Sequence, residues 1–275
     1  MKSLSESGFL VTESRARRFD ISHDIYAHLW TTESTHVLWE EFSKKVYPYD
    51  DIELSLRNRF FLDTLNTFIH STINPIFINI GAGFTSYPFL IKKPCKCIEV
   101  DLPNVIDFKK HNIQSFINEK KLPKKDIEFI AADLSKKEDM HYLHQELKTR
   151  INNHTSCIFL EGITYYLESI VLEKILEMCS IIQIKNSVLV FDYWDPTIVT
   201  NPVFNRFVSY FNERFGHKKN QYHLLDNDFI TSIKGYRIEE KTDIQQLEKK
   251  YLKTALLKDS EKIIPENYII LKRSL

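Results

Sequence analysis

Glycine is scarce in this chain, which has only six glycines in 275 residues. Average usage of about 7% would give roughly 19. Glycine accepts positive φ angles and lets a ligand approach the backbone closely, so few turns of that kind are expected. Two of the six, Gly81 and Gly83, fall in one turn, which makes that turn a candidate binding site.

Neither sign of charge is in excess, since 37 Lys and Arg balance 37 Asp and Glu. Neutralising phosphates requires a basic surplus, so we expect no nucleic-acid partner. No apolar run approaches the roughly 18 residues that cross a membrane, and the N-terminus lacks the apolar core of a secretory signal. We therefore expect a cytoplasmic protein without a membrane partner.

Disulfide and metal motifs are also lacking. Cys95 and Cys97 are one residue apart, unlike the two-residue spacing of redox and zinc motifs. We expect them, with Cys157 and Cys179, to be reduced and buried. The ten histidines contain no HExxH pattern, so no metal site is expected.

From residue 75 onward, short β-branched runs alternate with longer helical stretches. Strands are expected at residues 75–80, 95–101, 125–131, 156–160, 187–191, 236–242 and 267–272. Helices are expected at residues 31–46, 57–70, 103–120, 137–150, 169–183, 204–215 and 244–257. This alternation predicts an α/β fold with a mostly parallel seven-stranded sheet covered on both faces. The last two strands are expected to pair antiparallel at one edge.

The chain has no linker-like segment and no internal repeat, so we expect a single domain over residues 1–275. Within it, residues 1–70 form a helical N-terminal extension and residues 71–195 the core. Residues 196–235 surround a cap helix, and residues 236–275 contain the C-terminal strands.

Each of the first five expected strands ends on a glycine turn or an acidic residue. These are Gly81-Ala82-Gly83, Asp101, Asp133, Glu161 and Asp192. Ligands of open α/β sheets bind beyond the carboxyl ends of the strands. The pattern therefore predicts one binding site at this edge of the sheet.

The spacing of these residues indicates a nucleoside ligand. Asp101 lies 20 residues after Gly81, where an acidic side chain can accept both hydroxyls of a ribose. Capping of the helix that begins at Pro103 is the alternative role. Ser86 replaces the third glycine of the dinucleotide motif, and a pyrophosphate needs that glycine-rich turn. A nucleoside without phosphates, such as S-adenosylmethionine, is therefore favoured.

Other charged residues match the remaining parts of this ligand. Asp133 is placed to hydrogen-bond the adenine amino group, and Glu161 to receive the ammonium or lie near the sulfonium. Arg57 or Arg59 is placed to pair with the terminal carboxylate, because a guanidinium binds carboxylates in a bidentate manner.

Taken together, these segments resemble the leucine carboxyl methyltransferase family, S-adenosylmethionine-dependent methyltransferases that methylate carboxylates. The resemblance covers roughly residues 50–195. It rests on the segments LRNRFF (56–61), NIGAG (79–83), IEVDLP (98–103), ADL (132–134) and EGITYYL (161–167). It implies a Rossmann-like class I methyltransferase fold. Many family members have Asp at the place of Asn79 and an Asp-Thr-Arg run at residues 85–87.

The resemblance also implies contacts with the methionine part of the cofactor. Arg57 binds the carboxylate, and Arg17 adds a second cation there. The turn Gly81-Ala82-Gly83 lines the methionine moiety, and Glu161 with Gly162 lies near the amino group.

For the nucleoside, the resemblance implies that Asp101 with Leu102 holds the ribose. Asp133 and Leu134 frame the adenine.

The activity expected from the resemblance is in-line methyl transfer to a carboxylate oxygen of a small molecule. A carboxylate is ionised at pH 7, so no general base is required and no catalytic residue is assigned. Positioning of the reactants supplies the rate enhancement. Side chains expected near the substrate are Tyr165, Tyr166, Tyr193 and Arg206.

The sequence leaves three alternatives open. The acceptor is the C-terminus of a protein, as in eukaryotic family members; the chain is a nicotinamide-dependent oxidoreductase; or it is a non-catalytic cofactor-binding module.

Overall fold

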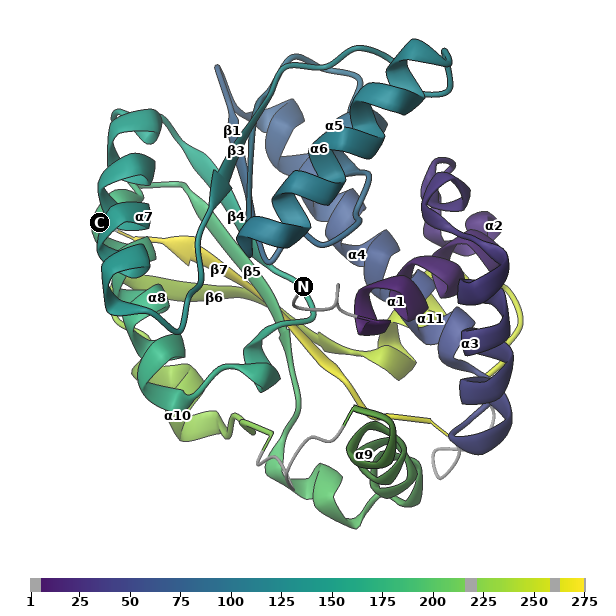
Figure 1. The fold of residues 1–275 in the computed structure, drawn as a ribbon. Coiled ribbons are helices and arrows are strands. Elements are labelled where there is room, and N and C mark those ends of the chain that lie inside the picture. The colour runs from purple at the N-terminus through teal and green to yellow at the C-terminus, as the bar shows by residue number, and fades with distance from the viewer. Residues whose placement is uncertain (1–5, 216–221, 258–262, 275) are drawn as a thin grey trace.

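The computed structural model describes residues 6–215, 222–257 and 263–274. They form one sheet in the order β3-β2-β1-β4-β5-β7-β6 (Figure 1). The strands are β1 (Ile76–Ile80), β2 (Lys96–Asp101), β3 (Ile127–Ala131), β4 (Ser156–Leu160), β5 (Val188–Tyr193), β6 (Tyr236–Asp243) and β7 (Asn267–Arg273).

Strands β1 to β5 are mutually parallel, and β7 runs antiparallel to both of its neighbours. The expected mostly parallel sheet and the antiparallel C-terminal pair are thus confirmed. The antiparallel strand β7 is inserted between β5 and β6, so β6 is the outermost strand of the pair.

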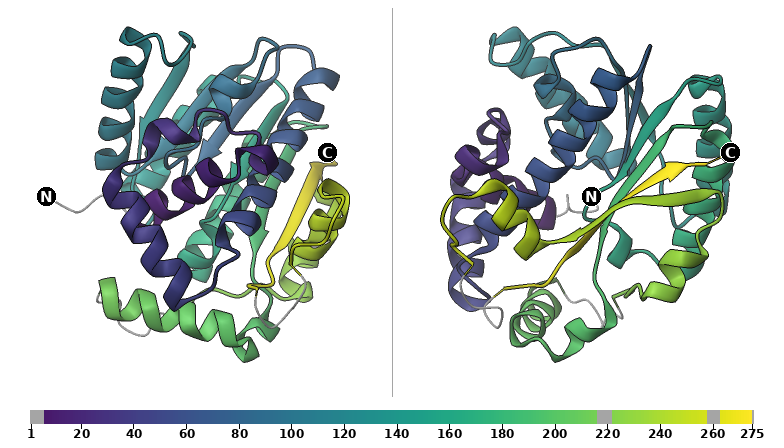
Figure 2. Two further views of the ribbon diagram at one scale, coloured as in Figure 1. Left: turned by 90° about the vertical axis from the view of Figure 1, so that its right-hand side faces the viewer. Right: turned by 180° about the vertical axis from the view of Figure 1, so that it is seen from behind.

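Helices cover both faces of the sheet (Figures 1 and 2). The α-helices are α1 (Glu6–Arg17), α2 (Phe19–Ser22), α3 (Glu33–Lys45), α4 (Asp50–Ser71), α5 (Tyr87–Leu90), α6 (Pro103–Asn118), α7 (Lys137–Ile151), α8 (Ser169–Ile182), α9 (Pro202–Phe215), α10 (Asn227–Ser232) and α11 (Ile244–Tyr251). Short 3₁₀ helices are η1 (Ala27–Trp30), η2 (Thr164–Tyr166) and η3 (Pro196–Thr200). No described helix is both long and apolar enough to cross a membrane.

The two faces of the sheet have separate cores because side chains alternate along each strand. Ile78 of β1 packs in the core shared with α7, α8 and α10. Its neighbour Phe77 packs in the core shared with α4, α5 and α11. All four cysteines are free thiols; Cys95 is half-buried and the other three are buried.

A third, aromatic cluster joins α1, α3 and α9 beyond the carboxyl ends of β4 and β5. Its members include Phe42 of α3, Phe207 of α9, Tyr165 and Trp194. Figure 2 shows α3 and α9 on the same side of the molecule. The N-terminal extension and the cap helix therefore pack together over one end of the sheet.

Two helices differ from the sequence expectation. Helix α4 begins at Asp50 rather than near residue 57, and its first turn holds Asp50, Asp51 and Glu53. Acidic residues stabilise a helix N-terminus through the helix dipole. Helix α11 ends at Tyr251, and the Glu248 carboxylate accepts hydrogen bonds from backbone amides beyond the helix end.

Candidate functional site

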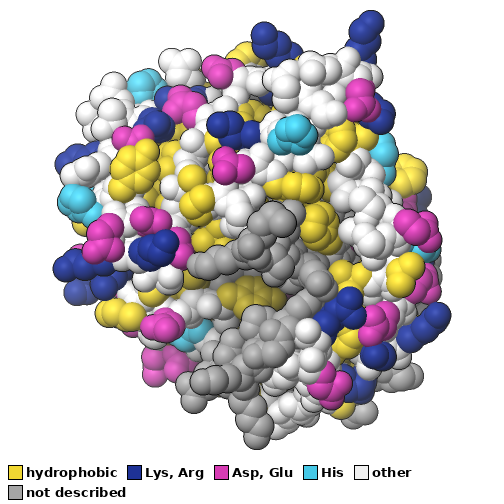
Figure 3. All heavy atoms as spheres, viewed as in Figure 1, with side chains coloured by type: hydrophobic (Ala, Val, Ile, Leu, Met, Phe, Trp, Pro, Cys, Tyr) yellow, Lys and Arg dark blue, Asp and Glu magenta, His cyan; other side chains and the backbone are white. Residues whose placement is uncertain are grey.

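A cavity of about 350 Å³ lies between the carboxyl ends of the strands and the aromatic cluster. Its lining includes five acidic side chains and one basic side chain among the described residues: Asp50, Glu53, Asp101, Glu161, Glu266 and Arg57. Figure 3 shows hydrophobic side chains gathered in a hollow near the middle of the face shown. The site therefore combines apolar walls with an excess of acidic groups.

The turn after β1 forms one wall of this cavity. Gly81 and Gly83 have φ angles of 76° and 44°, in the left-handed region that favours glycine. A Cβ on Gly81 would lie 2.5 Å from Ile163 Cγ2. The turn is braced from behind, since Asn79 Nδ2 donates to Thr85 Oγ1 at 2.9 Å, and Thr85 Oγ1 donates to Ala82 O at 2.8 Å. Asn79 and Thr85 thus hold the turn in shape.

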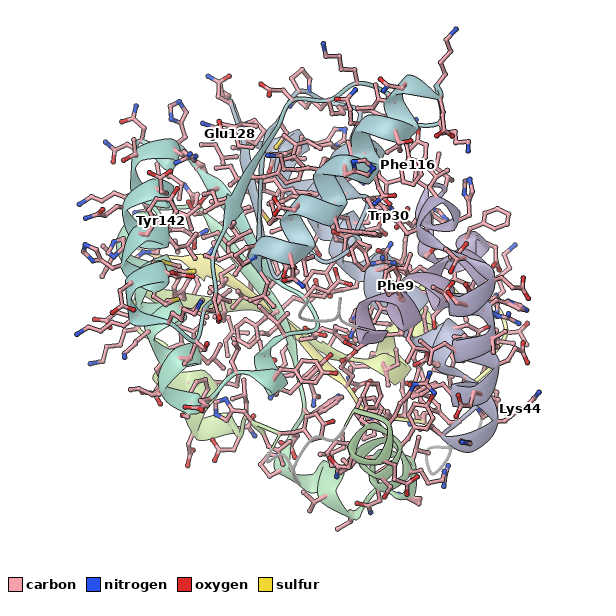
Figure 4. The ribbon with its side chains drawn as sticks, viewed as in Figure 1. Phe9, Trp30, Lys44, Phe116, Glu128 and Tyr142 are labelled. Atoms are coloured by element: carbon pink, nitrogen blue, oxygen red, sulfur yellow. The ribbon has the colours of Figure 1, made fainter. Side chains whose placement is uncertain are left out.

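Helix α1 closes over the next residue of this turn. Phe84 stacks between Phe9 of α1 and Trp30 of η1, with ring centroids 4.7 and 5.6 Å away. Trp30 in turn meets the edge of Phe116 of α6 (Figure 4). Arg15 Nη2 donates to Phe84 O at 3.1 Å. The N-terminal extension is therefore fixed directly to the glycine turn.

Asp101 joins the end of β2 to the same turn. Its Oδ2 accepts from Gly83 N and its Oδ1 from Leu102 N, both at 2.7 Å. Burial raises the pKa of Asp101, and these two amides oppose that shift. Asp101 does not cap α6, whose N-cap residue is Leu102. Its carboxylate instead faces the cavity beside Gly83.

The Arg57 guanidinium, from the middle of α4, meets three buried carboxylates. Its Nη1 lies 3.2 Å from Asp192 Oδ2 and 3.3 Å from Glu266 Oε1. Its Nε lies 3.4 Å from Glu161 Oε1, an oxygen that accepts no hydrogen bond from the described residues. Its Nη1 also donates to Tyr165 Oη at 3.1 Å. Three carboxyl groups thus share one guanidinium, and burial raises the pKa of Asp192 well above its usual value.

Two further acids of α4 line the cavity: Glu53, one helical turn before Arg57, and Asp50, about two turns before it. Asp50, Glu53 and Arg57 are spaced i, i+3 and i+7, which puts them on one face of α4. Tyr47 Oη lies 2.7 Å from Glu53 Oε2 and 3.2 Å from Asp50 Oδ1. Burial raises the pKa of Asp50 to about 6 and that of Glu53 well above its usual value.

Some residues named from the sequence lie away from the described lining. Asp133 Oδ1 accepts from the Ser135 backbone and hydroxyl at 3.1 and 2.6 Å, so its side chain closes its own loop. Leu134 packs against the core of the α7 and α8 face. Arg59 points away from Arg57 and pairs with Asp63 at 2.9 Å.

Arg17 is also placed elsewhere. Its guanidinium lies over the Trp39 ring at 3.7 Å and pairs with Glu40 at 3.4 Å. The buried arginine of α1 is Arg15, two residues earlier, which pairs with Asp24 at 3.7 Å. A displacement of two residues along a helix turns a side chain to a different face.

The four candidates near the substrate separate into two pairs. Tyr165 and Tyr166 line the cavity. Tyr193 follows Asp192 on β5 and so points to the opposite face, into the core with α7 and α8. Arg206 Nε donates to Val46 O at 2.8 Å and joins α9 to the end of α3.

Four residues of the site were not predicted from the sequence: Asp50, Glu53, Tyr47 and Glu266. The i, i+3, i+7 spacing with Arg57 is a signal that could have identified the first two. Glu266 precedes β7 and reaches Arg57 across 209 residues of chain, which no local pattern reveals.

Several solved structures have a similar fold, and the names of two of the following three describe methyltransferases. A candidate methyltransferase from Thermobifida fusca YX has a TM-score of 0.66 and 12% identity, over 97% of this chain and 94% of that one. A DUF574 family protein from Streptomyces avermitilis MA-4680 has a TM-score of 0.63 and 12% identity, over 93% and 100%. Magnesium protoporphyrin IX methyltransferase from Synechocystis PCC 6803, solved with bound S-adenosylhomocysteine, has a TM-score of 0.51 and 9% identity, over 96% and 100%. The fold is the Rossmann-like fold of S-adenosylmethionine-dependent methyltransferases.

The family follows from the sequence match. Residues 14–180, more than half of the chain, match the model of the leucine carboxyl methyltransferase family, and the chain belongs to that family. This membership supports S-adenosylmethionine as the cofactor. Among curated proteins, none matches the chain.

Proposed function

We propose that this methyltransferase transfers a methyl group to a carboxylate oxygen of a small molecule. The observation that carries the proposal is the convergence of Gly81, Asp101, Glu161 and Arg57 on one cavity in a chain of this family. Bound S-adenosylmethionine supplies a methyl group on a sulfonium, and its transfer forms a C–O bond while the C–S electrons remain on sulfur.

The residues around the cavity fit such a cofactor. Glu161 Oε1 is a buried acceptor without a hydrogen bond from the described chain, which suits an ammonium donor. A Cβ on Gly81 would clash with Ile163, so only glycine keeps this turn in place, and with Ala82 and Gly83 it is proposed to line the methionine part. Gly162 has a φ of 70° and would place a Cβ 3.3 Å from Arg57 Nη2. Arg57, which lines the cavity, is proposed to pair with the cofactor carboxylate.

Asp101 with Leu102 is proposed to hold the ribose. Asp133 and Leu134 are proposed to border the adenine, because Asp101 is paired in register with Ala131, two residues before Asp133. Arg17 lies on α1, and its proposed role at the carboxylate is the one that the contacts support least, since Trp39 and Glu40 engage its guanidinium.

The acceptor step requires positioning more than proton transfer. An ionised carboxylate is already nucleophilic, and holding it in line is worth up to about 7–11 kcal/mol. Tyr165 and Tyr166 line the cavity where they can exclude water from the reacting groups. The proposal therefore assigns these tyrosines positioning roles and requires no general base.

Calorimetry and a methyl-ester assay test this function. Asp101→Ala should weaken S-adenosylmethionine binding by about 10- to 100-fold, the worth of a hydrogen bond to a charged group. Arg59→Ala is the matched control, because Arg59 pairs with Asp63 outside the lining. Wild-type protein should form base-labile methyl esters from a panel of carboxylic acids. Cofactor binding without any methyl ester would contradict carboxyl methylation.

A further inference from the structure

The cavity has an acidic end beyond Arg57 that the proposed cofactor contacts do not use. Asp50 and Glu53 lie on the first turn of α4 and line the cavity. At 1.5 Å per residue, Asp50 is about 10 Å along the helix from Arg57. In the described chain the hydrogen bonds of both acids go to Ser14, Tyr47 and Ile264, and none goes to the glycine turn or Asp101.

The acids at this end have neutral hydrogen-bond partners. Ser14 Oγ donates to Asp50 Oδ2, and Tyr47 Oη contacts both Asp50 and Glu53. The backbone amide of Ile264 donates to Glu53 Oε1 at 3.2 Å. Within the described residues, no lysine or arginine forms an ion pair with either carboxyl group.

Burial raises the pKa of Asp50 and the charge of Arg57 partly opposes that shift, but Arg57 forms its ion pairs with other carboxylates. It is shared among Glu161, Asp192 and Glu266 at 3.2–3.4 Å. Tyr268 Oη donates to the other oxygen of Glu266 at 2.7 Å. One guanidinium shared among three carboxyl groups leaves Asp50 and Glu53 without an ion-pair partner of their own in the described chain.

Aromatic rings complete this end of the cavity. Phe42, Tyr47, Phe207 and Trp194 line it, and Trp194 stacks on Tyr165 with centroids 3.9 Å apart. Trp194 Nε1 is buried and has no acceptor in the described chain. Carboxylates combined with aromatic faces are the groups that bind an ammonium, through ion pairing and cation–π attraction.

We propose that the methyl acceptor is a zwitterion, an amine-bearing carboxylic acid whose ammonium binds between Asp50, Glu53 and the aromatic rings. The inference rests on the proposed carboxyl methylation and names its substrate class. The acceptor carboxylate points toward the cofactor end, and the ammonium stays protonated at the far end. Because the ammonium only binds, the methyl transfer itself is unchanged.

Burial of these acids agrees with a cation site. A buried carboxyl group without a basic partner costs stability, and burial raises the pKa of both Asp50 and Glu53. A bound ammonium would offset that cost. Elsewhere on α4, Asp63 has a cation within the protein, because Arg59 Nε lies 2.9 Å from its Oδ2.

Matched acceptors test the substrate class. The full chain is incubated with methyl-labelled S-adenosylmethionine and a series of ω-amino carboxylic acids, each paired with its N-acetyl derivative. The amino acids should give methyl esters with kcat/KM about tenfold or more above their acetylated partners. Glu53→Gln should remove this preference while leaving cofactor binding unchanged. Asp51→Asn, on the same helical turn but outside the described lining, should keep the preference.

The outcomes separate the two proposals. Equal rates for the amine and acetyl partners, or a preference that survives Glu53→Gln and Asp50→Asn, would overturn the zwitterionic acceptor alone. If no acid is esterified, carboxyl methylation fails, and calorimetry with hexylamine in the presence of S-adenosylhomocysteine still tests the ammonium site. If hexylamine binds to the wild type and Glu53→Gln abolishes this binding, the ammonium site is supported. If hexylamine does not bind to the wild type, the site is refuted. A base-stable N-methyl product would overturn the assigned orientation.

Discussion

Two buried charge clusters lie on either side of the glycine turn, and their balance differs. Lys109 of α6 and Glu99 of β2 are both fully buried and lie 2.8 Å apart, one charge against one. Arg57 of α4 meets the carboxylates of Glu161, Asp192 and Glu266. The first cluster is closed and balanced; the second opens onto the cavity with acid in excess.

This difference in charge balance indicates a structural role for the Lys109–Glu99 pair and a binding role for the Arg57 cluster. Lys109 Nζ lies 3.5 Å from Ala82 O, so the balanced pair supports the glycine turn from beneath. Burying charges is costly unless each is paired, and the pair meets that condition within the protein. In the acid-rich cluster, three carboxyl groups have only one guanidinium as an ion-pair partner in the described chain. We infer that a bound ligand supplies a further partner.

The largest expected effect comes from breaking the balanced pair. Lys109→Met leaves Glu99 as a buried carboxylate without its partner, which typically costs about 3–5 kcal/mol of unfolding free energy. Urea denaturation measures this loss. In the double variant Lys109→Met/Glu99→Leu, which removes both charges, we expect recovery of most of the stability. A single-variant loss below about 1 kcal/mol would contradict the assigned structural role.

Asp50, which lines the same cavity as the Arg57 cluster, should make the stability of the protein depend on pH. Burial raises the pKa of Asp50 from 3.8 to about 6, so the folded protein holds this proton more tightly than the unfolded chain does. The corresponding stability is present below about pH 4 and lost as the pH rises through 6. The variant Asp50→Asn has no group that titrates at this position, so it should not lose this stability as the pH rises. Its amide keeps polar atoms near Ser14 and Tyr47.

The variant Asp50→Asn should therefore gain stability relative to wild type between about pH 4 and 7. The gain is at most about 3 kcal/mol, from about two pKa units at 1.36 kcal/mol each. Urea midpoints at acidic and neutral pH measure it. A difference that is independent of pH would show that Asp50 is not held in the protonated form by folding.

A smaller effect is expected in the turn between the clusters. Gly81→Val places side-chain atoms against Ile163 at a φ of 76°, and the displaced turn should lower S-adenosylmethionine affinity about 100-fold. Gly83→Ala is the control, because its Cβ meets nothing within 4 Å. It should cost only the left-handed strain of about 1–2 kcal/mol in stability. Equal cofactor affinity for wild type and Gly81→Val would place the cofactor elsewhere.

Sequence patterns predicted the sheet well, because they are local. The expected strand at 156–160 matches β4 in both bounds, and the glycine turn, Asp101 and Glu161 all reach the cavity. The start of α4 and the end of α11 were not predicted. Both depend on contacts made elsewhere, as the amides bound by the Glu248 carboxylate show.

Side-chain direction was less predictable than position in the chain. Tyr193 and Asp192 are neighbours, yet only Asp192 reaches Arg57. Asp133 stands at a strand end as expected, but its carboxylate bonds to Ser135. These choices depend on strand alternation and loop closure, which composition and motif spacing do not encode.

The sequence by itself determined the strand–helix alternation, the placement of polar residues at strand ends and the family of the chain, because each is carried by residues near one another. The tertiary structure decided the charge balance of the site. Glu266 and Asp192 meet Arg57 from 209 and 135 residues away. Only folding brings those carboxylates to one guanidinium, and only folding leaves Asp50 and Glu53 buried beside them.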